Sequence, residues 1–225
     1  MIKMRPGDKR FLNYEWIPML ANHVPAGLHI FEIGTGDGNI TESIAKISQN
    51  VRTFEIDKKL YKIAVKRLNK YQNVQVYNDD ALSNVPFSNE VVFSDLPFSQ
   101  SRRFIDWVAE NPINDIYVVV QREFYGKIMA ETGTRKYGAI SVIAQFLFDI
   151  KKIIDVPASA YTPAPAVSAV YLNIKRIRKC VLSKSEIIAI RNFMSNKTSK
   201  SRIDGKRVFQ LKPEEVIEQV GIHSC

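Results

Sequence analysis

The stretch Ser94–Ser99 combines side chains that could hold a flat ring bearing an amine. Asp95 supplies a carboxylate acceptor, Pro97 fixes the backbone φ of the turn, and Phe98 offers an aromatic face. An exocyclic amine could donate to Asp95 and to the carbonyl of Leu96 while its ring stacks on Phe98. Taken alone, the stretch is more often a turn closed by proline with an aromatic in the core. Its interpretation therefore depends on the motifs around it.

A glycine-rich loop follows the apolar run at 28–33 and precedes a helical apolar pattern at 40–47. The dinucleotide motif G-x-G-x-x-G would place its third glycine at position 39, whereas here it comes one place early, at Gly38. A G-K-[ST] phosphate cradle is also missing from the sequence. The pattern Glu32-x-Gly34-x-Gly36-x-Gly38 instead resembles the first motif of S-adenosylmethionine-dependent methyltransferases. That cofactor has no phosphate, and glycines would leave room for its close approach.

Acidic residues stand at the ends of the next two predicted strands. Glu55 fits an acceptor for two ribose hydroxyls, and Asp80 fits an acceptor for the adenine amine of the cofactor. Strand ends are commonly acidic in any α/β domain, but three glycine or acidic ends in succession are much less ordinary. We therefore predict an S-adenosyl-L-methionine site across three strand ends, with the Asp95 stretch beside it.

Strand-like segments alternate with helical patterns along most of the chain, which predicts a doubly wound, Rossmann-like α/β sheet of seven strands. The expected strands are 28–33, 52–57, 74–80, 90–95, 116–121, 146–156 and 170–177. The expected helices include 14–24, 40–47 and 60–68. We expect the last two strands, both rich in β-branched residues, to form an antiparallel pair.

The composition suits one core with a small appendage, since 45% of the 225 residues are hydrophobic. The two cysteines, Cys180 and Cys225, offer neither a disulfide framework nor a metal spacing, which favours a reducing compartment. The sequence contains no apolar run long enough for a transmembrane helix, and the first residues lack the apolar core of a signal peptide. We therefore expect a cytoplasmic protein that does not bind a membrane.

The net charge of +9 is concentrated in one segment. Between Lys175 and Arg207, eleven Lys and Arg residues face only Glu186 and Asp204. The rest of the chain is neutral, with 21 basic and 21 acidic residues. Such a segment is either a solvated charged face or the contact for a polyanion, and nucleic-acid phosphates are the usual polyanion.

Together these motifs resemble the ribosomal RNA adenine N6,N6-dimethyltransferase family, whose members modify adenines near the 3′ end of small-subunit RNA. The resemblance runs from about Lys9 to Lys175, with a weaker one near 206–216. It is carried by Arg10-Phe11-Leu12, the Glu32 to Gly38 motif, Asp95-Leu96-Pro97-Phe98 and the segment Tyr161-Thr162-Pro163-Ala164-Pro165-Ala166-Val167.

The resemblance implies one set of residues for the cofactor and another for the target base. The S-adenosyl-L-methionine site would comprise Arg10, Leu12, Glu32, Gly34, Gly36, Gly38, Glu55, Ile56, Asp80, Ala81 and Asp95. The target adenine would be held by Asp95, Leu96, Pro97, Phe98 and Tyr161, without a metal. Residues 1–175 would form the methyltransferase domain, and 176–225 a truncated, basic C-terminal helical segment that contacts RNA. Lys9, Arg102, Arg103 and Arg122 would help to hold the RNA backbone.

The expected partner is ribosomal RNA or a pre-ribosomal small subunit, bound by a monomer. Asp95 stands where the family has asparagine, and Arg10 also replaces an asparagine. Aspartate cannot donate a hydrogen bond, so the sequence leaves open whether one or two methyl groups are added. Two alternatives remain: an inactive RNA-binding or ribosome-assembly factor of the same fold, and an adenine methyltransferase that acts on another RNA or on DNA.

Overall fold

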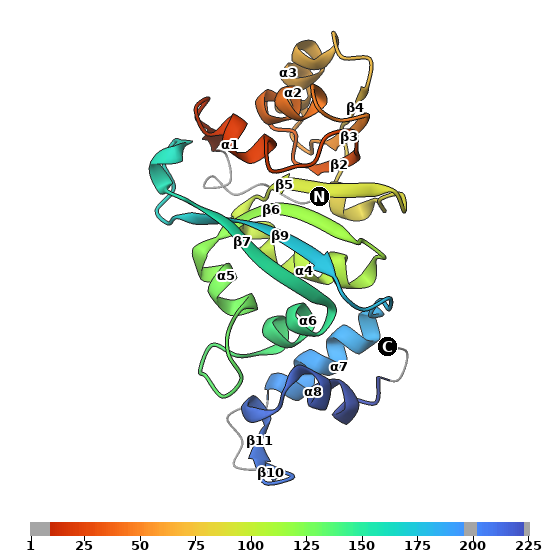
Figure 1. The fold of residues 1–225 in the computed structure, drawn as a ribbon, viewed down its shortest axis with the longest axis vertical. Helices are drawn as coiled ribbons and strands as arrows, with labels where there is room; N and C mark the ends of the chain where they lie inside the picture. Colours follow the sequence, from red (N-terminus) through yellow and green to blue (C-terminus); the bar gives the residue numbers. More distant parts are fainter. Residues whose placement is uncertain (1–9, 196–201, 223–225) are drawn as a thin grey trace. The chain divides into compact units, whose positions relative to one another are not determined.

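The structure is a computed structural model, and it describes residues 10–195 and 202–222. These residues divide into two compact units, each built from separate parts of the chain. The described residues of the first unit are 10–101, 113–121 and 151–174, and those of the second are 102–112, 122–150, 175–195 and 202–222. Figure 1 labels the helices and strands used below.

Among the described residues, the first unit is organised around a seven-stranded sheet with the order β4-β3-β2-β5-β6-β9-β7. Its strands are β2 (His29–Ile33), β3 (Asn50–Phe54), β4 (Val74–Tyr77), β5 (Glu90–Asp95), β6 (Asp115–Gln121), β7 (Phe148–Val156) and β9 (Ala169–Arg176). All seven expected strands are confirmed, and the last two are hydrogen-bonded neighbours as expected. Residues 148–150 of β7 and 175–176 of β9 fall in the second unit.

The parallel pairing of the central strands fixes where a ligand can bind. β2 pairs in parallel with β3 on one side and with β5 on the other, and β3 and β5 pair in parallel with β4 and β6. The chain runs outward from β2 through β4 and then returns to β5 on the opposite side of β2. This reversal of strand order makes β2 and β5 a topological switch point, where open α/β sheets bind ligands at the carboxyl ends of the strands.

Three helices of the first unit follow from apolar spacing: α1 (Ile17–Ala21), α2 (Asn39–Ala45) and α3 (Lys58–Leu68). The side chain of Asp57 caps α3 by accepting the N–H groups of Lys59 and Leu60. The buried core beneath them includes Ile30, Ile44, Val51, Phe93 and Tyr171. Because each of these side chains leaves water, their burial stabilises the sheet and its helices together.

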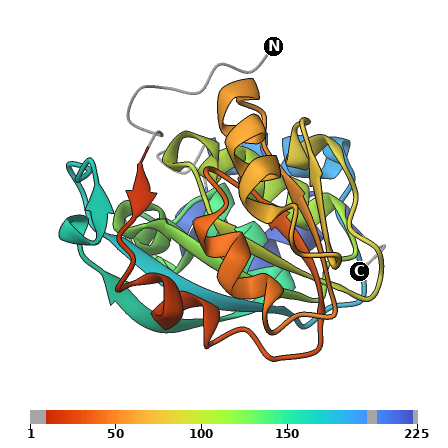
Figure 2. The same cartoon turned by 90° about the horizontal axis from the view of Figure 1, so that it is seen from above.

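A second, two-stranded sheet joins distant parts of this unit. β1 (Phe11–Leu12) pairs antiparallel with β8 (Tyr161–Thr162), and Leu12 is opposite Tyr161. β1 is the red strand in Figure 2. The backbone N–H of Asn13 continues this contact by donating to the carbonyl of Ala160 at 2.8 Å. Residue 10 is therefore held beside residue 161, although 151 positions separate them in the sequence.

Several expected boundaries were wrong by a few residues. The strand at 52–57 ends at Phe54, and that at 74–80 ends at Tyr77. Both end early because Asp57 and Asp80 turn the chain by capping the helical segments that follow. The helix at 14–24 spans only Ile17–Ala21, and residues 146–147 belong to a helix rather than to β7.

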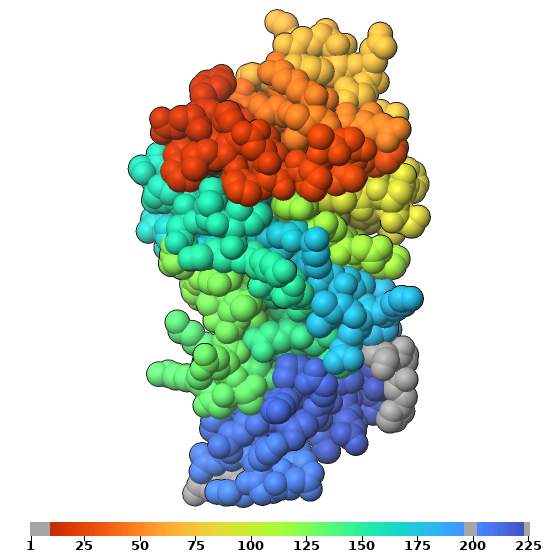
Figure 3. Space-filling model, in the orientation of Figure 1, coloured from red at the N-terminus to blue at the C-terminus, as the bar shows by residue number. Residues whose placement is uncertain are grey.

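The second unit is helical. It contains α4 (Ser101–Glu110), α5 (Arg122–Ile128), α6 (Ala139–Leu147), α7 (Lys184–Ser195) and α8 (Pro213–Gln219), with a hairpin of β10 (Arg202–Ile203) and β11 (Lys206–Arg207). Helix α6 contacts α5, α7 and α8. The residues of α7, the hairpin and α8 are those coloured blue in Figure 3. The C-terminal helices thus pack with helices from the middle of the chain.

Arg176 stabilises this unit from within. Its guanidinium donates to the carbonyls of Val108, Asn111 and Cys180 at 2.5–2.7 Å, so it binds carbonyls at the C-terminal end of α4. Burial lowers the pKa of Arg176 to about 10. Cys180 is disulfide-bonded, which differs from the expectation, and Cys225 lies outside the described residues.

Candidate functional site

The loop after β2 has the backbone that its glycines predict. Gly34, Gly36 and Gly38 all have positive φ, at 83°, 60° and 85°. A Cβ at Gly34 would lie 3.9 Å from Pro97, and one at Gly36 would lie 4.0 Å from Phe11, which are ordinary van der Waals distances. A Cβ at Gly38 would lie 3.2–3.3 Å from Arg67 and Leu68 of α3. Gly38 thus permits close packing of α3. Gly34 and Gly36 are needed because the loop backbone has positive φ at both positions.

Glu32 is buried next to this loop and does not face solvent. Its side chain is buried, and its Oε2 accepts hydrogen bonds from the hydroxyls of Thr41 and Thr53 at 2.7 and 2.5 Å. Burial raises the pKa of Glu32 to about 7. The hydroxyls of Thr35 and Thr53 are also hydrogen-bonded, at 2.6 Å. Glu32 therefore ties the loop and the start of α2 to β3.

Glu55 is the first residue after β3, at the edge of the glycine loop. Its Oε2 accepts the N–H of Gly36 at 2.8 Å, and its Oε1 accepts the N–H of Asp57 at 2.7 Å. Burial raises the pKa of this carboxyl, and the two backbone hydrogen bonds oppose the shift. Each oxygen has a further lone pair, so the oriented carboxylate can also accept hydroxyls from a ligand.

The third strand end carries Asp80, which caps the short helix Ala81–Ser83. Its two oxygens accept the N–H of Leu82 at 3.1 Å and the hydroxyl of Ser83 at 3.2 Å. Ala81 is buried behind it, and Ile56 is half-buried beside Glu55 in the sequence. The strand order β4-β3-β2-β5 brings the three predicted ends and Asp95 to one sheet edge.

Asp95 is the last residue of β5 and forms the centre of a polar cluster. Nη2 of Arg10 donates to Oδ1 of Asp95 at 3.1 Å and to the carbonyl of Leu96 at 3.0 Å. The hydroxyl of Tyr161 donates to the same Oδ1 at 3.1 Å. Burial raises the pKa of Asp95, and the charge of Arg10 opposes that shift. The pKa of Tyr161 is also raised, first by burial and then by the charge of Asp95.

The guanidinium of Arg10 lies between two aromatic rings. Its carbon is 3.6 Å from the centroid of Phe98 and 4.9 Å from that of Tyr161. Its Nε is buried and has no hydrogen-bond partner among the residues that the structure describes. The two acceptors and the aromatic faces assigned above to a target ring are thus all engaged by one arginine. The family resemblance implied that Arg10 lies near the cofactor, and the sequence gave no sign of this arrangement.

The remaining predicted residues lie around this cluster. Pro97 lies opposite Gly34, with its Cδ 3.9 Å from the position of a Cβ there. Phe11 is similarly 4.0 Å from such a position at Gly36. The side chain of Leu12 is buried in the core of the first unit. The N-terminal strand therefore lies along the glycine loop and the Asp95 cluster together.

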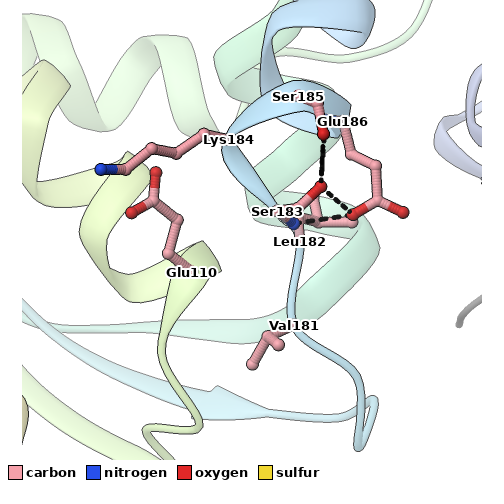
Figure 4. A pocket seen from close by; sticks show the side chains of 7 residues that line it. All are labelled: Glu110, Val181, Leu182, Ser183, Lys184, Ser185 and Glu186. Atoms are coloured by element: carbon pink, nitrogen blue, oxygen red, sulfur yellow. Dashed lines mark hydrogen bonds between the residues drawn. The ribbon is translucent and has the colours of Figure 1, made fainter.

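A pocket in the second unit is separate from these residues. It is lined by Glu110, Val181, Leu182, Ser183, Lys184, Ser185 and Glu186 (Figure 4). Its polar groups mostly serve the start of α7, since the N–H and hydroxyl of Ser183 both donate to Glu186 at 2.7 Å. The described part of the chain holds no group of three or more potential metal ligands. Within the same residues, no helix is long and apolar enough to span a bilayer.

A sheet whose order reverses beside a glycine loop, with an acidic residue after the second strand, defines a Rossmann-like methyltransferase fold. Solved structures agree on the fold. A dimethyladenosine transferase from Plasmodium falciparum is 18% identical, with a TM-score of 0.75 and full coverage of both chains. The 23S rRNA methyltransferase ErmE is 22% identical, with a TM-score of 0.68, over 93% of this chain and 98% of its own.

The sequence comparisons define the family. The family model "Ribosomal RNA adenine dimethylase" matches residues 20–196, and the chain belongs to that family. "Ribosomal RNA small subunit methyltransferase A" of Thermotoga maritima is 34% identical over 65% of this chain. The protein of the same name from Thermotoga neapolitana is 31% identical over 86% of this chain and 80% of its own length. The match to the Thermotoga maritima protein spans only 53% of that relative.

Proposed function

We propose that the chain transfers methyl groups from S-adenosyl-L-methionine to the N6 amine of an adenine in RNA, and that the RNA is that of the small ribosomal subunit. Family membership supports the reaction class. One observation carries the assignment of the site. The Asp95 carboxylate and the Leu96 carbonyl converge on a single planar NH2 group, which lies over an aromatic ring. An adenine amine presents the same shape and the same two donors.

The residues at the first three strand ends fit the cofactor. The loop at Gly34 and Gly36, where the glycines carry no side chain, would receive its methionine and ribose parts. The Glu55 carboxylate, already oriented by two backbone amides, would accept the ribose hydroxyls, and Asp80 would accept the adenine amine. The bound cofactor supplies an electrophilic methyl group on a positively charged sulfur.

The Asp95 cluster would supply the positioning that the amine needs. The N6 lone pair of adenine is delocalised into the ring, which makes the amine a weak nucleophile. Hydrogen bonds from its two protons to Asp95 and Leu96 would localise that lone pair toward the methyl group. The new N–C bond forms from the lone pair, the S–C electrons stay on sulfur, and one amine proton leaves to solvent. Orientation and electrostatics would therefore provide most of the acceleration.

The base must leave its stack to reach this site. Phe98 and Tyr161 would then grip its two faces and replace the stacking that the base had in the RNA. Tyr161 has its hydroxyl fixed on Asp95, so its ring is already oriented. Pro97 holds the turn between Asp95 and Phe98 with φ at −54°.

Part of the basic segment is available to bind RNA. Among the described residues of that segment, Arg178, Arg191 and Lys206 bind Glu214, Asp106 and Glu215, and Arg176 binds carbonyls. The exposed Lys179, Lys184, Arg202 and Arg207 are our candidates for phosphate contacts. Lys9, Lys197 and Lys200 lie outside the described residues. We infer a cytoplasmic location, because the proposed substrate is a ribosomal particle, and the monomer expected from the sequence stays a prediction.

Labelled cofactor tests this function directly. The purified chain would be incubated with small ribosomal subunits that lack adenine dimethylation, with free RNA of those subunits, and with duplex DNA. Nucleoside mass spectrometry would then identify the product. We expect N6-methylated adenosine in the small-subunit RNA. Methylation of DNA alone would replace the RNA assignment, and methylation of another base would contradict the proposed role of the site.

A second candidate is an RNA-binding factor of the same fold without turnover. It is favoured by the position of Arg10, whose side chain fills the place proposed for the base. Calorimetry with S-adenosyl-L-methionine and the product assay above together separate the two. A turnover-competent enzyme binds the cofactor and transfers its methyl group, whereas a binding factor yields no product from any of the substrates above.

A further inference from the structure

We propose that Arg10 competes with the target adenine for its site, and that this competition favours release of the RNA after one methyl transfer. The proposal rests on the proposed function and adds to it the expected product. Its basis is the overlap between two sets of contacts. The Arg10 guanidinium uses the Asp95 carboxylate, the Leu96 carbonyl and the faces of Phe98 and Tyr161, all of which the base requires.

Arg10 is a strong competitor because its backbone is held nearby. Residues 11–12 pair with 161–162, and the Asn13 side chain adds hydrogen bonds to Ser159 and Thr162 at 2.8 Å. The guanidinium therefore has a high effective concentration at the site without losing the freedom of a separate molecule. To admit a base, the side chain must swing aside while β1 stays paired. Its unpaired Nε would gain solvation when it leaves, which makes the exchange feasible.

The competition depends on how many N–H groups the incoming base carries. An unmethylated adenine amine has two, so it can satisfy both the Asp95 carboxylate and the Leu96 carbonyl. After one transfer the amine has a single N–H, and one of these acceptors would be left unpaired at a buried position. Arg10 can satisfy both acceptors and also neutralise the carboxylate. Arg10 therefore displaces N6-methyladenine more readily than adenine.

The identity of residue 95 strengthens this bias. A carboxylate buried without a partner carries a larger free-energy cost than a neutral amide would, so the return of Arg10 is favoured by charge as well as by hydrogen bonding. Side-chain exposure at the pair is only 3% for Arg10 and 11% for Asp95. The ion pair between Arg10 and Asp95 would therefore favour release of the singly methylated base.

The product ratio tests the proposal. Small ribosomal subunits that lack adenine dimethylation serve as substrate, and mass spectrometry measures N6-methyladenosine and N6,N6-dimethyladenosine over time. For the wild type we expect the monomethylated product to dominate. Arg10→Ala should raise the dimethyl to monomethyl ratio by roughly tenfold, since one unpaired buried acceptor has an effect of that order. Arg10→Lys keeps the positive charge but loses the planar guanidinium. Its dimethyl to monomethyl ratio should therefore lie between those of the wild type and Arg10→Ala.

A binding measurement gives a readout that is independent of turnover. Ligand-observed NMR would compare adenosine with N6-methyladenosine as probes, using chains whose thermal unfolding shows that they are folded. The wild type should favour adenosine, and Arg10→Ala should bind both nucleosides more tightly by a similar factor, since one tethered competitor lowers both apparent affinities equally. Equal nucleoside affinities and equal product ratios in all three chains would overturn the proposal. If no chain methylates RNA, the proposed function fails, and the nucleoside titration still decides the competition.

Discussion

Nη2 of Arg10 lies 3.1 Å from Oδ1 of Asp95, although 85 positions separate the two residues in the sequence. The pair joins the segment before β1 to the end of β5, and both side chains are almost fully buried. Removing one partner of such a pair leaves a charge without compensation, which is more costly than replacing both. The behaviour of Asp95 variants is therefore best examined together with Arg10.

Asp95→Ala should abolish the hydrogen bond to the target amine and lower the rate of methyl transfer by about 100-fold. Binding of S-adenosyl-L-methionine should change little, because the cofactor is assigned mainly to Gly34, Glu55 and Asp80. Initial rates and calorimetry check the two expectations separately. Asp95→Asn keeps an acceptor oxygen and serves as the matched control, which should retain transfer. A normal rate in Asp95→Ala would show that the carboxylate has no role in transfer.

Glu32 should make stability fall as the pH rises. The pKa of its carboxyl is raised to about 7 in the folded chain, whereas an unfolded glutamate titrates at its ordinary value. The folded state thus holds a proton that the unfolded state releases, so this contribution is complete below about pH 4 and is lost as the pH rises through 7. The difference amounts to about 3 kcal/mol of unfolding free energy. Urea unfolding between pH 4.5 and 8 measures it.

Glu32→Gln provides the control for that experiment. The amide keeps the size of the side chain and does not titrate, so the unfolding free energy should vary less across the same range. If wild type and Glu32→Gln lose stability equally with rising pH, another group is responsible for the dependence.

Arg176→Met should destabilise the second unit. Three carbonyls of that unit would lose a donor, and the expected cost is roughly 2–4 kcal/mol of unfolding free energy. Lys206→Met is a suitable comparison, since it also removes a cation from the same unit, but from an exposed pair with Glu215. Its expected cost is below about 1 kcal/mol. Chemical denaturation measures the unfolding free energy of both variants. Equal losses in the two variants would contradict the stabilising role of Arg176.

RNA affinity should depend on salt through the exposed cations of the C-terminal segment. Replacing Lys179, Lys184, Arg202 and Arg207 by glutamine should weaken binding and flatten the dependence of log K on log salt by about 0.7–0.9 for each phosphate that is no longer neutralised. Filter binding at several salt concentrations measures this slope. A second group of cations could also bind RNA. Outside the C-terminal segment the chain is neutral overall, but α3 carries four exposed lysines, at positions 58, 59, 62 and 66.

Those α3 lysines supply the matched comparison. Glutamine at all four removes the same charge from the first unit. If the α3 variant changes the slope and the C-terminal variant does not, the RNA contact belongs to α3 rather than to the segment inferred from sequence.

The sheet could be predicted because each strand is a local apolar run, and the first four of them, β2 to β5, end at or near glycine or an acidic residue. The adjacency of Gly34, Glu55 and Asp95 then follows from parallel pairing and the strand order. The place of Arg10 could not be predicted in this way, because it depends on pairing between β1 and β8, which join residues far apart in the chain. The hydrogen bonds from Thr41 and Thr53 to the Glu32 carboxylate could not be predicted either, since no local pattern brings those three side chains together.

The discontinuous second unit has a practical consequence for anyone seeking a minimal catalytic fragment. Helix α6 buries Val142, Ile143 and Leu147, and it contacts α7 and α8. A chain stopped after residue 174 would expose part of that apolar helix to water and would be prone to aggregate. Exchange of the C-terminal helices with those of a relative would therefore succeed only if the matching surface of α6 were grafted with them.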